Sequence, residues 1–184
     1  MTRRLVAPVL AALTLFGCGA PIVYYRYVST YTPGEYAYAG PLWLDVRGNP
    51  YDVTQQQLDT ALADDLSGYL WGIRTQFVTT RDPMSRSPYK VVWVFDPPDY
   101  AYGDFLCGGG KTVQQTPSGG STKVFAVLCR GDVPISYVYA GFGSDGPGDP
   151  AFRTAVRYIE VALLPARNEN FGTAGADGDE IARN

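Results

Sequence analysis

The sequence contains no histidine among its 184 residues. This absence excludes Ser-His-Asp triads, Cys-His nucleophile pairs, imidazole bases and histidine metal sites. An excess of basic residues is missing as well, because 15 Lys and Arg stand against 18 Asp and Glu, for a formal charge of −3. Nucleic-acid binders usually carry a basic face. The two absences argue against a nucleic-acid partner and against the commonest catalytic arrangements.

A run that could span a bilayer is not evident, since the apolar stretch Leu5–Phe16 has only 12 residues. A membrane-spanning helix needs about 20. The stretch follows Arg3 and Arg4 and precedes Gly17 and Cys18, an order typical of a secretory signal peptide. The full chain is 46% hydrophobic and 14% aromatic, which excludes a fully disordered protein. We therefore expect an exported chain with a folded core.

The end of the signal segment, Leu15-Phe16-Gly17-Cys18, resembles the lipobox of bacterial lipoprotein precursors. The resemblance implies that residues 1–17 are removed and that Cys18 carries diacylglycerol, with a fatty acid such as palmitate on the new amine. Several acyl chains anchor a protein durably. Gly19 stands where Asp would retain a lipoprotein in the inner membrane, which implies the outer membrane, facing the periplasm. The alternative is an ordinary cleaved signal peptide with a chance cysteine.

The mature chain keeps two cysteines, Cys107 and Cys129, and its formal charge becomes −5 because two basic residues leave with the signal. An even pair in an oxidising compartment predicts a disulfide. It would close a loop of about 23 residues and stabilise the fold by about 3 kcal/mol. A free thiol is the alternative, although no histidine is present to activate it.

Four regions follow from the composition along the chain: a signal peptide over 1–17, a Tyr-rich lipid-anchored tether over 18–40, a domain over 41–165 and a disordered tail over 166–184. The tether holds six of the 14 tyrosines, and its segment Ile22–Val28 could pair as a strand. An aromatic surface for a polymer or a partner is the functional alternative for this segment.

Hydrophobic periodicity predicts the elements of the domain. Thr54 and Gln57 form a capping-box pattern that starts a helix reaching Ile73, and Asp149-Pro150 starts a second helix that ends at Pro165. Alternating or continuous apolar runs predict strands at 41–47, 89–95, 123–129 and 135–140. We therefore expect an α+β domain, with a small antiparallel sheet of about four strands and two helices on one face.

Two glycine-rich motifs are not assigned to nucleotides. Gly108–Thr112 lacks the first glycine of a phosphate-binding loop, and Pro147-Gly148 separates the glycines of 141–146 from the next helix. The acids at 145 and 149 do not have the spacing of a calcium-binding loop. We therefore expect no nucleotide, no cofactor and no metal.

A segment with aromatic and acidic residues follows the strand at 89–95. Rings stack on the apolar faces of sugars and carboxylates accept hydrogen bonds from sugar hydroxyls, so this segment is a candidate site for a glycan or small ligand. Its residues are Trp93, Asp96, Asp99, Tyr100, Tyr102 and Asp104. A glycoside hydrolase would need two of these acids about 5–10 Å apart, and we keep hydrolysis by Asp96 and Asp99 as a further alternative.

No catalytic motif accompanies these features, and the domain resembles small envelope lipoproteins. The sequence therefore predicts a non-catalytic, membrane-anchored lipoprotein with an interaction or assembly role towards another envelope protein. The alternative is a binding module for a glycan or small ligand that uses the 93–104 segment.

Overall fold

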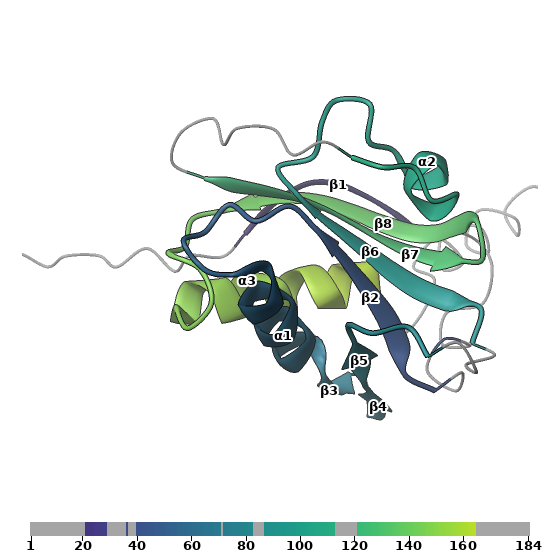
Figure 1. Cartoon of the computed structure of the whole chain (residues 1–184), viewed down its shortest axis with the longest axis horizontal. Coiled ribbons are helices and arrows are strands. Elements are labelled where there is room, and N and C mark those ends of the chain that lie inside the picture. The colour runs from purple at the N-terminus through teal and green to yellow at the C-terminus, as the bar shows by residue number, and fades with distance from the viewer. Residues whose placement is uncertain are drawn as a thin grey trace, which may run out of the picture.

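The computed structural model describes residues 21–28, 36, 40–70, 72–82, 87–112 and 121–164. The expected signal peptide, the lipidation site Cys18 and the expected tail at 166–184 lie outside these residues. The described part is α+β, with one six-stranded sheet, one two-stranded sheet and three helices (Figure 1).

The large sheet has the strand order β1-β8-β7-β6-β2-β5. Its strands are β1 (Ile22–Val28), β2 (Leu42–Arg47), β5 (Phe77–Val78), β6 (Tyr89–Phe95), β7 (Thr122–Arg130) and β8 (Val133–Phe142). The second sheet is a hairpin of β3 (Gly68–Leu70) and β4 (Ile73–Thr75). The helices are α1 (Gln55–Leu66), α2 (Gly103–Cys107) and α3 (Pro150–Leu163).

The expectation of a small, purely antiparallel sheet of about four strands is wrong. Strand β2 pairs in parallel with both β6 and β5, whereas β6, β7, β8 and β1 pair antiparallel in turn. The physical reason is the helix between β2 and β6, since a helical connection returns the chain to run in the same direction. The sheet is therefore mixed, with a parallel half and an antiparallel half.

The first strand corrects the boundary between tether and domain. The residues Ile22–Val28 pair antiparallel with β8 over its whole length, from Ile22 opposite Gly141 to Val28 opposite Ser136. The folded domain therefore begins at β1 and not at residue 41. Residues 29–35 and 37–39 of the expected tether lie outside the described part of the chain.

Both predicted helix starts are present. The Thr54 hydroxyl accepts from the Gln57 amide at 3.2 Å and the Gln57 side chain accepts from the Thr54 amide at 2.9 Å. In α3, the Asp149 carboxylate accepts from the Ala151 amide at 2.8 Å. The first helix ends at Leu66 and not at residue 73, because Gly68 adopts φ +151° and opens the β3–β4 hairpin.

The two faces of the large sheet differ in what covers them (Figure 1). Helices α1 and α3 lie together on one face, as expected, and bury the main core between themselves and the sheet. The short helix α2, which was not predicted, covers part of the opposite face and packs on β7 and β8. Strand β6 serves both sides, because Trp93 faces the main core while Val92 and Val94 face α2.

Candidate functional site: an aromatic platform on the outer face

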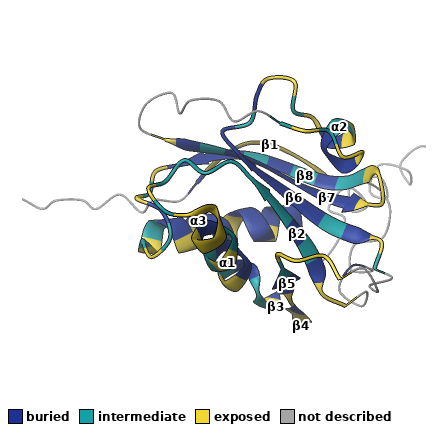
Figure 2. Cartoon of the chain, in the orientation of Figure 1, coloured by how far each residue is buried: buried dark blue, intermediate teal, exposed yellow. Residues whose placement is uncertain are grey.

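Beyond α2, the same face of the sheet carries a group of aromatic rings on β1, β8 and β7, which we call the aromatic platform. Its members are Tyr24, Tyr25, Tyr27, Phe125, Tyr137 and Tyr139. The three β1 tyrosines are 51%, 49% and 44% exposed, and Figure 2 shows most of β1 as exposed beside the buried centre of the sheet. The β1 tyrosines are therefore accessible, whereas Phe125 is buried and Tyr137 and Tyr139 pack against the buried cluster under α2.

Strand register builds the platform. Tyr25 lies opposite Tyr139 and Tyr27 lies opposite Tyr137, so the rings meet in cross-strand pairs. The ring centroids are 5.2 Å apart in the first pair and 5.1 Å in the second, and both pairs are stacked. Phe125 extends the group onto β7, with its ring centroid 5.5 Å from that of Tyr137. The rings support one another and need little ordering when a ligand arrives.

An irregularity in β1 adds the sixth ring. The register shifts between Val23 and Tyr25, so the strand carries an extra residue there. As a result Tyr24 reaches Tyr139 as well, at a centroid distance of 5.3 Å. Gly141 makes room for this ring, because a Cβ atom at that position would lie 2.8 Å from the Tyr24 hydroxyl. Two adjacent tyrosines therefore contact one partner ring.

Tyr25 and Tyr139, at the centre of the platform, remain uncharged at neutral pH. Burial raises the pKa of Tyr25, and the neighbouring Tyr139 and Tyr137 raise it further. Burial is also the main reason why the pKa of Tyr139 is raised, followed by Tyr24, Asp99 and Asp96. Phenols with pKa values above their usual 10 stay protonated at pH 7. These two hydroxyls can therefore still donate a hydrogen bond to a ligand.

The predicted 93–104 site is not brought together as one surface. Trp93 is fully buried in the main core and lies on the helix side of the sheet. Asp96 is only 6% exposed, and its Oδ1 atom accepts from the Lys123 amide at 3.1 Å. Burial raises the pKa of Asp96, while the amide and the charge of Lys123 lower it. Both residues contribute to the folded structure, and neither is exposed on the outer face of the sheet that α2 covers.

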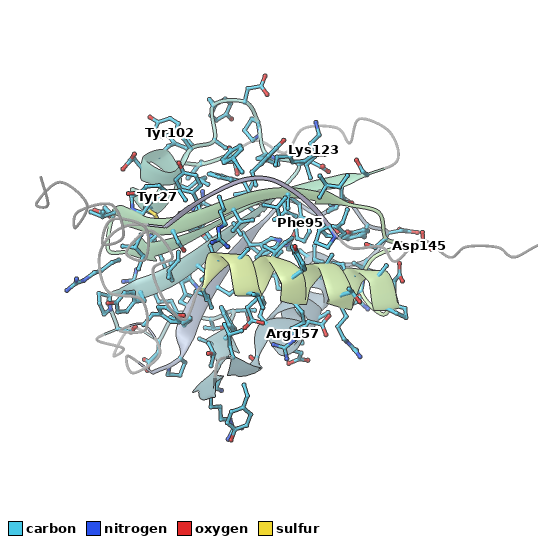
Figure 3. The ribbon with its side chains drawn as sticks, turned by 180° about the vertical axis from the view of Figure 1, so that it is seen from behind. Tyr27, Phe95, Tyr102, Lys123, Asp145 and Arg157 are labelled. Carbon is cyan, nitrogen blue, oxygen red and sulfur yellow. A yellow bond between two sulfur atoms is a disulfide. The ribbon has the colours of Figure 1, made fainter. Side chains whose placement is uncertain are left out.

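The other four predicted residues do lie on the outer side. Tyr100 and Tyr102 are exposed and pack against Phe105 of α2, with ring centroids 5.7 and 5.8 Å away. Asp104 is exposed in the first turn of α2. Figure 3 shows Tyr102 on the outer side of the sheet, whereas Phe95 lies between the sheet and α3. These rings form a small cluster around α2 that borders the platform.

Asp99 is the predicted acid that the structure brings to the platform. It lines a pocket of about 140 Å³ together with Tyr25, Phe125 and Tyr139, and Pro97 and Pro98 form the adjoining wall. The pocket therefore has an aromatic side and a carboxylate side. This is the combination of residue types that the sequence predicted, assembled from different strands.

A disulfide holds α2 beside the platform. Cys107 at the end of α2 is bonded to Cys129 on β7, and both are fully buried. Lys90 adds a second tie, since its Nζ atom donates to the Cys107 carbonyl at 2.6 Å. At the other end of α2, a Cβ atom on Gly103 would lie 3.0 Å from Pro134 and 3.5 Å from the Tyr137 ring. The helix is thus fixed against the platform strands.

Sequence reasoning missed Phe125, Tyr137 and Tyr139. Their signal was the alternation in 135–140, where tyrosines occupy every second position opposite those of β1. Within the described residues, no three acidic or cysteine side chains gather as metal ligands would. No helix in the same residues is long and apolar enough to cross a membrane.

Comparison with known proteins gives a distant likeness of fold. No family model and no curated protein matches the sequence. Among solved structures, the chain is similar to two dodecamer structures of PelC from Paraburkholderia phytofirmans, one of them a variant. The TM-scores are 0.42 and 0.41 at 12% identity, and the alignments cover 80% of this chain and 99% of the other. The proposals below rest on this chain's own residues.

Proposed function

We propose that this chain is a non-catalytic lipoprotein of the bacterial envelope, anchored through Cys18 to the periplasmic side of a membrane, with the outer membrane favoured. Its role is to bind another envelope component through the aromatic platform. The lipobox-like segment Leu15–Cys18 supports the anchor. The observation that carries the binding role is the set of six rings on one sheet face, three of which are about half exposed.

Aromatic rings in this number are unusual on a surface with no role. Tyrosine is enriched at protein interfaces, because a rigid ring buries a large apolar area and its hydroxyl finds a hydrogen bond. The platform rings already stack on one another, so binding costs little side-chain entropy. A continuous, preorganised and uncharged aromatic patch therefore fits a specific contact better than it fits a solvated strand.

The anchor and the platform are close along the chain. Cys18 precedes the first residue of β1, Ile22, by four residues. Four extended residues span at most about 14 Å. A lipid on Cys18 would therefore hold β1 next to the membrane surface, and the partner must be reachable there.

The anchor is tested by labelling cells with a fatty acid analogue that can be captured. We expect label on the wild-type chain and none on Cys18→Ser. Label that persists in Cys18→Ser, or no label on the wild type, would contradict the anchor while leaving the platform hypothesis standing.

The binding role is tested with a photo-reactive amino acid placed at Tyr27 in the full chain in cells. Position Tyr158 on α3 is the matched control, because it is 52% exposed and lies in the helix layer on the other side of the sheet. We expect a discrete cross-linked product from Tyr27 only, and its loss when Tyr25→Ala is added. Equal products from both positions, or none from Tyr27, would overturn the role of the platform.

A glycan is a second candidate for the bound component, favoured by the pocket that Asp99 shares with Tyr25 and Tyr139. A sugar ring can stack on the tyrosines while the carboxylate accepts its hydroxyl hydrogens. Soluble envelope glycan fragments should bind the mature protein and lose affinity in Asp99→Asn. Asp64→Asn on α1 is the control, since Asp64 is exposed on the helix side. Equal binding by both variants would remove this candidate.

A further inference from the structure

A larger pocket, of about 420 Å³, lies away from the platform at the end of the sheet where β2 and β6 begin. Trp43 and Tyr89 supply aromatic walls, and the charged residues around it are Arg81, Asp82, Lys90 and Asp132. The volume suits a small ligand. None of the residues that line this pocket belongs to the aromatic platform.

The charges at the pocket are of both signs, and two of them are available. Lys90 donates to the Cys107 carbonyl at 2.6 Å, so its ammonium group is already engaged. Asp82 has an interaction partner as well. Within the described ranges, neither the Arg81 guanidinium nor the Asp132 carboxylate takes part in a hydrogen bond or ion pair. The pocket therefore presents one free cation and one free anion among its described residues.

The two free charges belong to different parts of the sheet. The Arg81 guanidinium lies over the Trp43 ring, with its central carbon 5.4 Å from the centroid, so it is held above β2. Asp132 lies in the turn after β7. Strand β6 separates β2 from β7 in the sheet. Neighbouring strands are about 4.8 Å apart, which puts roughly 10 Å between β2, whose Trp43 ring lies under the guanidinium, and β7, whose following turn carries Asp132.

This separation determines how long a zwitterionic ligand must be to reach both charged side chains. A free amino acid carries its ammonium and carboxylate groups on the same carbon atom, so it cannot reach both. An extended peptide gains about 3.3–3.6 Å per residue, so two or three residues span about 7–11 Å. With a hydrogen bond at each end, such a peptide can meet both side chains.

We propose that this pocket binds peptides of two or three residues with free termini. The guanidinium fork of Arg81 pairs with the terminal carboxylate, because planar two-point contact is the geometry in which Arg binds carboxylates best. Asp132 pairs with the terminal ammonium group. An apolar side chain of the peptide packs on Trp43, which the Arg81 contact already holds in place. This inference is independent of the function proposed for the platform.

Calorimetric titration of the mature chain with Ala-Leu and Ala-Phe tests the proposal. We expect saturable binding of both dipeptides, and at least a tenfold loss of affinity when either terminus is blocked by acetylation or amidation. Free leucine should bind at least tenfold more weakly than Ala-Leu. Equal affinity for free and blocked peptides, or no heat from either dipeptide at millimolar concentration, would overturn the proposal.

Variants separate the roles of the two charges. Arg81→Gln should weaken binding of the free dipeptide at least tenfold but leave the affinity for the C-terminally amidated peptide unchanged. Asp132→Asn should weaken binding of the free dipeptide to the same extent but leave the affinity for the N-terminally acetylated peptide unchanged. Arg74→Gln is the matched control for Arg81, because Arg74 is exposed on β4 and does not line the pocket. Affinities that fall equally in Arg74→Gln and Arg81→Gln would show a general charge effect and contradict a built site.

Discussion

The two faces of the large sheet are built from the same strands but from different side chains. The face under α1 and α3 carries leucine, valine, isoleucine and phenylalanine side chains that are almost wholly buried. The outer face carries a smaller buried cluster under α2 and, beside it, the half-exposed tyrosines of β1. A leucine or valine side chain is apolar throughout, whereas a tyrosine side chain ends in a polar hydroxyl group that can stay in contact with water.

The contrast indicates that one face of the sheet mainly stabilises the fold, whereas the exposed tyrosines on the other face are available for binding. Hydrophobic stabilisation follows the apolar area removed from water, so most of it comes from the helix-covered face. The exposed tyrosines of the outer face bury less apolar area, so replacing them should cost little stability. A substitution on each face should therefore separate stability from binding.

The largest effect is expected in the middle of the helix-covered face, at Phe152. This ring is fully buried and meets Tyr51 and Phe142 at centroid distances of 5.7 and 6.3 Å. Phe152→Ala should reduce the free energy of unfolding by about 3–5 kcal/mol, measured by urea denaturation. Phe152→Leu keeps most of the volume and should cost less than about 1.5 kcal/mol. A small effect of the alanine variant would mean that α3 does not form the main core.

The next largest effect on stability is expected from the Cys107–Cys129 disulfide, which attaches α2 to β7. The cysteines are 22 positions apart, so the bond closes a loop whose entropy corresponds to about 3 kcal/mol. The double variant Cys107→Ala/Cys129→Ala should lower the unfolding free energy by about this amount. Reductant should lower the thermal midpoint of the wild type and leave that of the double variant unchanged. A wild type that ignores reductant under unfolding conditions would contradict a stabilising disulfide.

The helix starts and the central strands could be predicted because their signals are local. Thr54 with Gln57, and Asp149 before Pro150, satisfy the first amides of a helix within three residues of chain. The apolar runs at 89–95 and 123–129 are long enough to mark buried strands. These features do not depend on what the rest of the chain does.

The missed elements depend on distant partners. Strands β3, β4 and β5 have only two or three residues each, too few to show a period. Strand β1 was not missed, but the sequence offered Ile22–Val28 only as one that could pair, because its partner β8 follows it by more than a hundred residues. The parallel pairing of β2 and β6 was missed because the helix between them was not read as a crossover connection.

The candidate site shows the same limit. The sequence prediction grouped tyrosines with a neighbouring acid along one segment of the chain, and the structure does not keep this group together. Trp93 and Asp96 belong to the core and to a β6–β7 contact, and only Asp99 reaches the exposed tyrosines. In a strand, neighbours in sequence point to opposite faces, so a surface is assembled across strands and not along one.

A buried acid in the helix layer gives a prediction for pH. Glu160 on α3 is 1% exposed, its Oε2 atom is 2.7 Å from Arg157, and its Oε1 atom has no hydrogen-bond partner among the described residues. Burial raises the pKa of Glu160 against the opposing pull of Arg157. A raised pKa in the folded state means that the contribution to stability is complete below the unfolded pKa and is lost as pH rises through the folded one.

Glu160→Gln should therefore gain stability over the wild type as pH rises from about 4 to 7, measured from urea midpoints at each pH. Arg157 keeps a partner in the variant, since it also donates to the Ser67 carbonyl at 3.2 Å. Asp64→Asn, an exposed change on α1, should leave the pH profile unchanged. A stability difference between Glu160→Gln and wild type that shrinks with rising pH would show that the ion pair outweighs burial.

The smallest effect on stability is expected on the platform, where the comparison of the two faces is sharpest. Tyr27 is about half exposed and its main contact is the stacked ring of Tyr137. Cross-strand aromatic pairs contribute about 0.2–1 kcal/mol, so Tyr27→Ala should lower the unfolding free energy by no more than about 1 kcal/mol. Tyr158→Ala in the helix layer, at similar exposure, provides the matched comparison.

Both alanine variants should therefore unfold close to the wild type. When the photo-reactive amino acid is placed at Tyr25 instead of Tyr27, only Tyr27→Ala should lose the cross-linked product. A loss above about 2 kcal/mol in Tyr27→Ala would show that the outer rings stabilise the sheet as a core does. In that case their exposure would be a consequence of folding, and the binding role of the platform would lose its support.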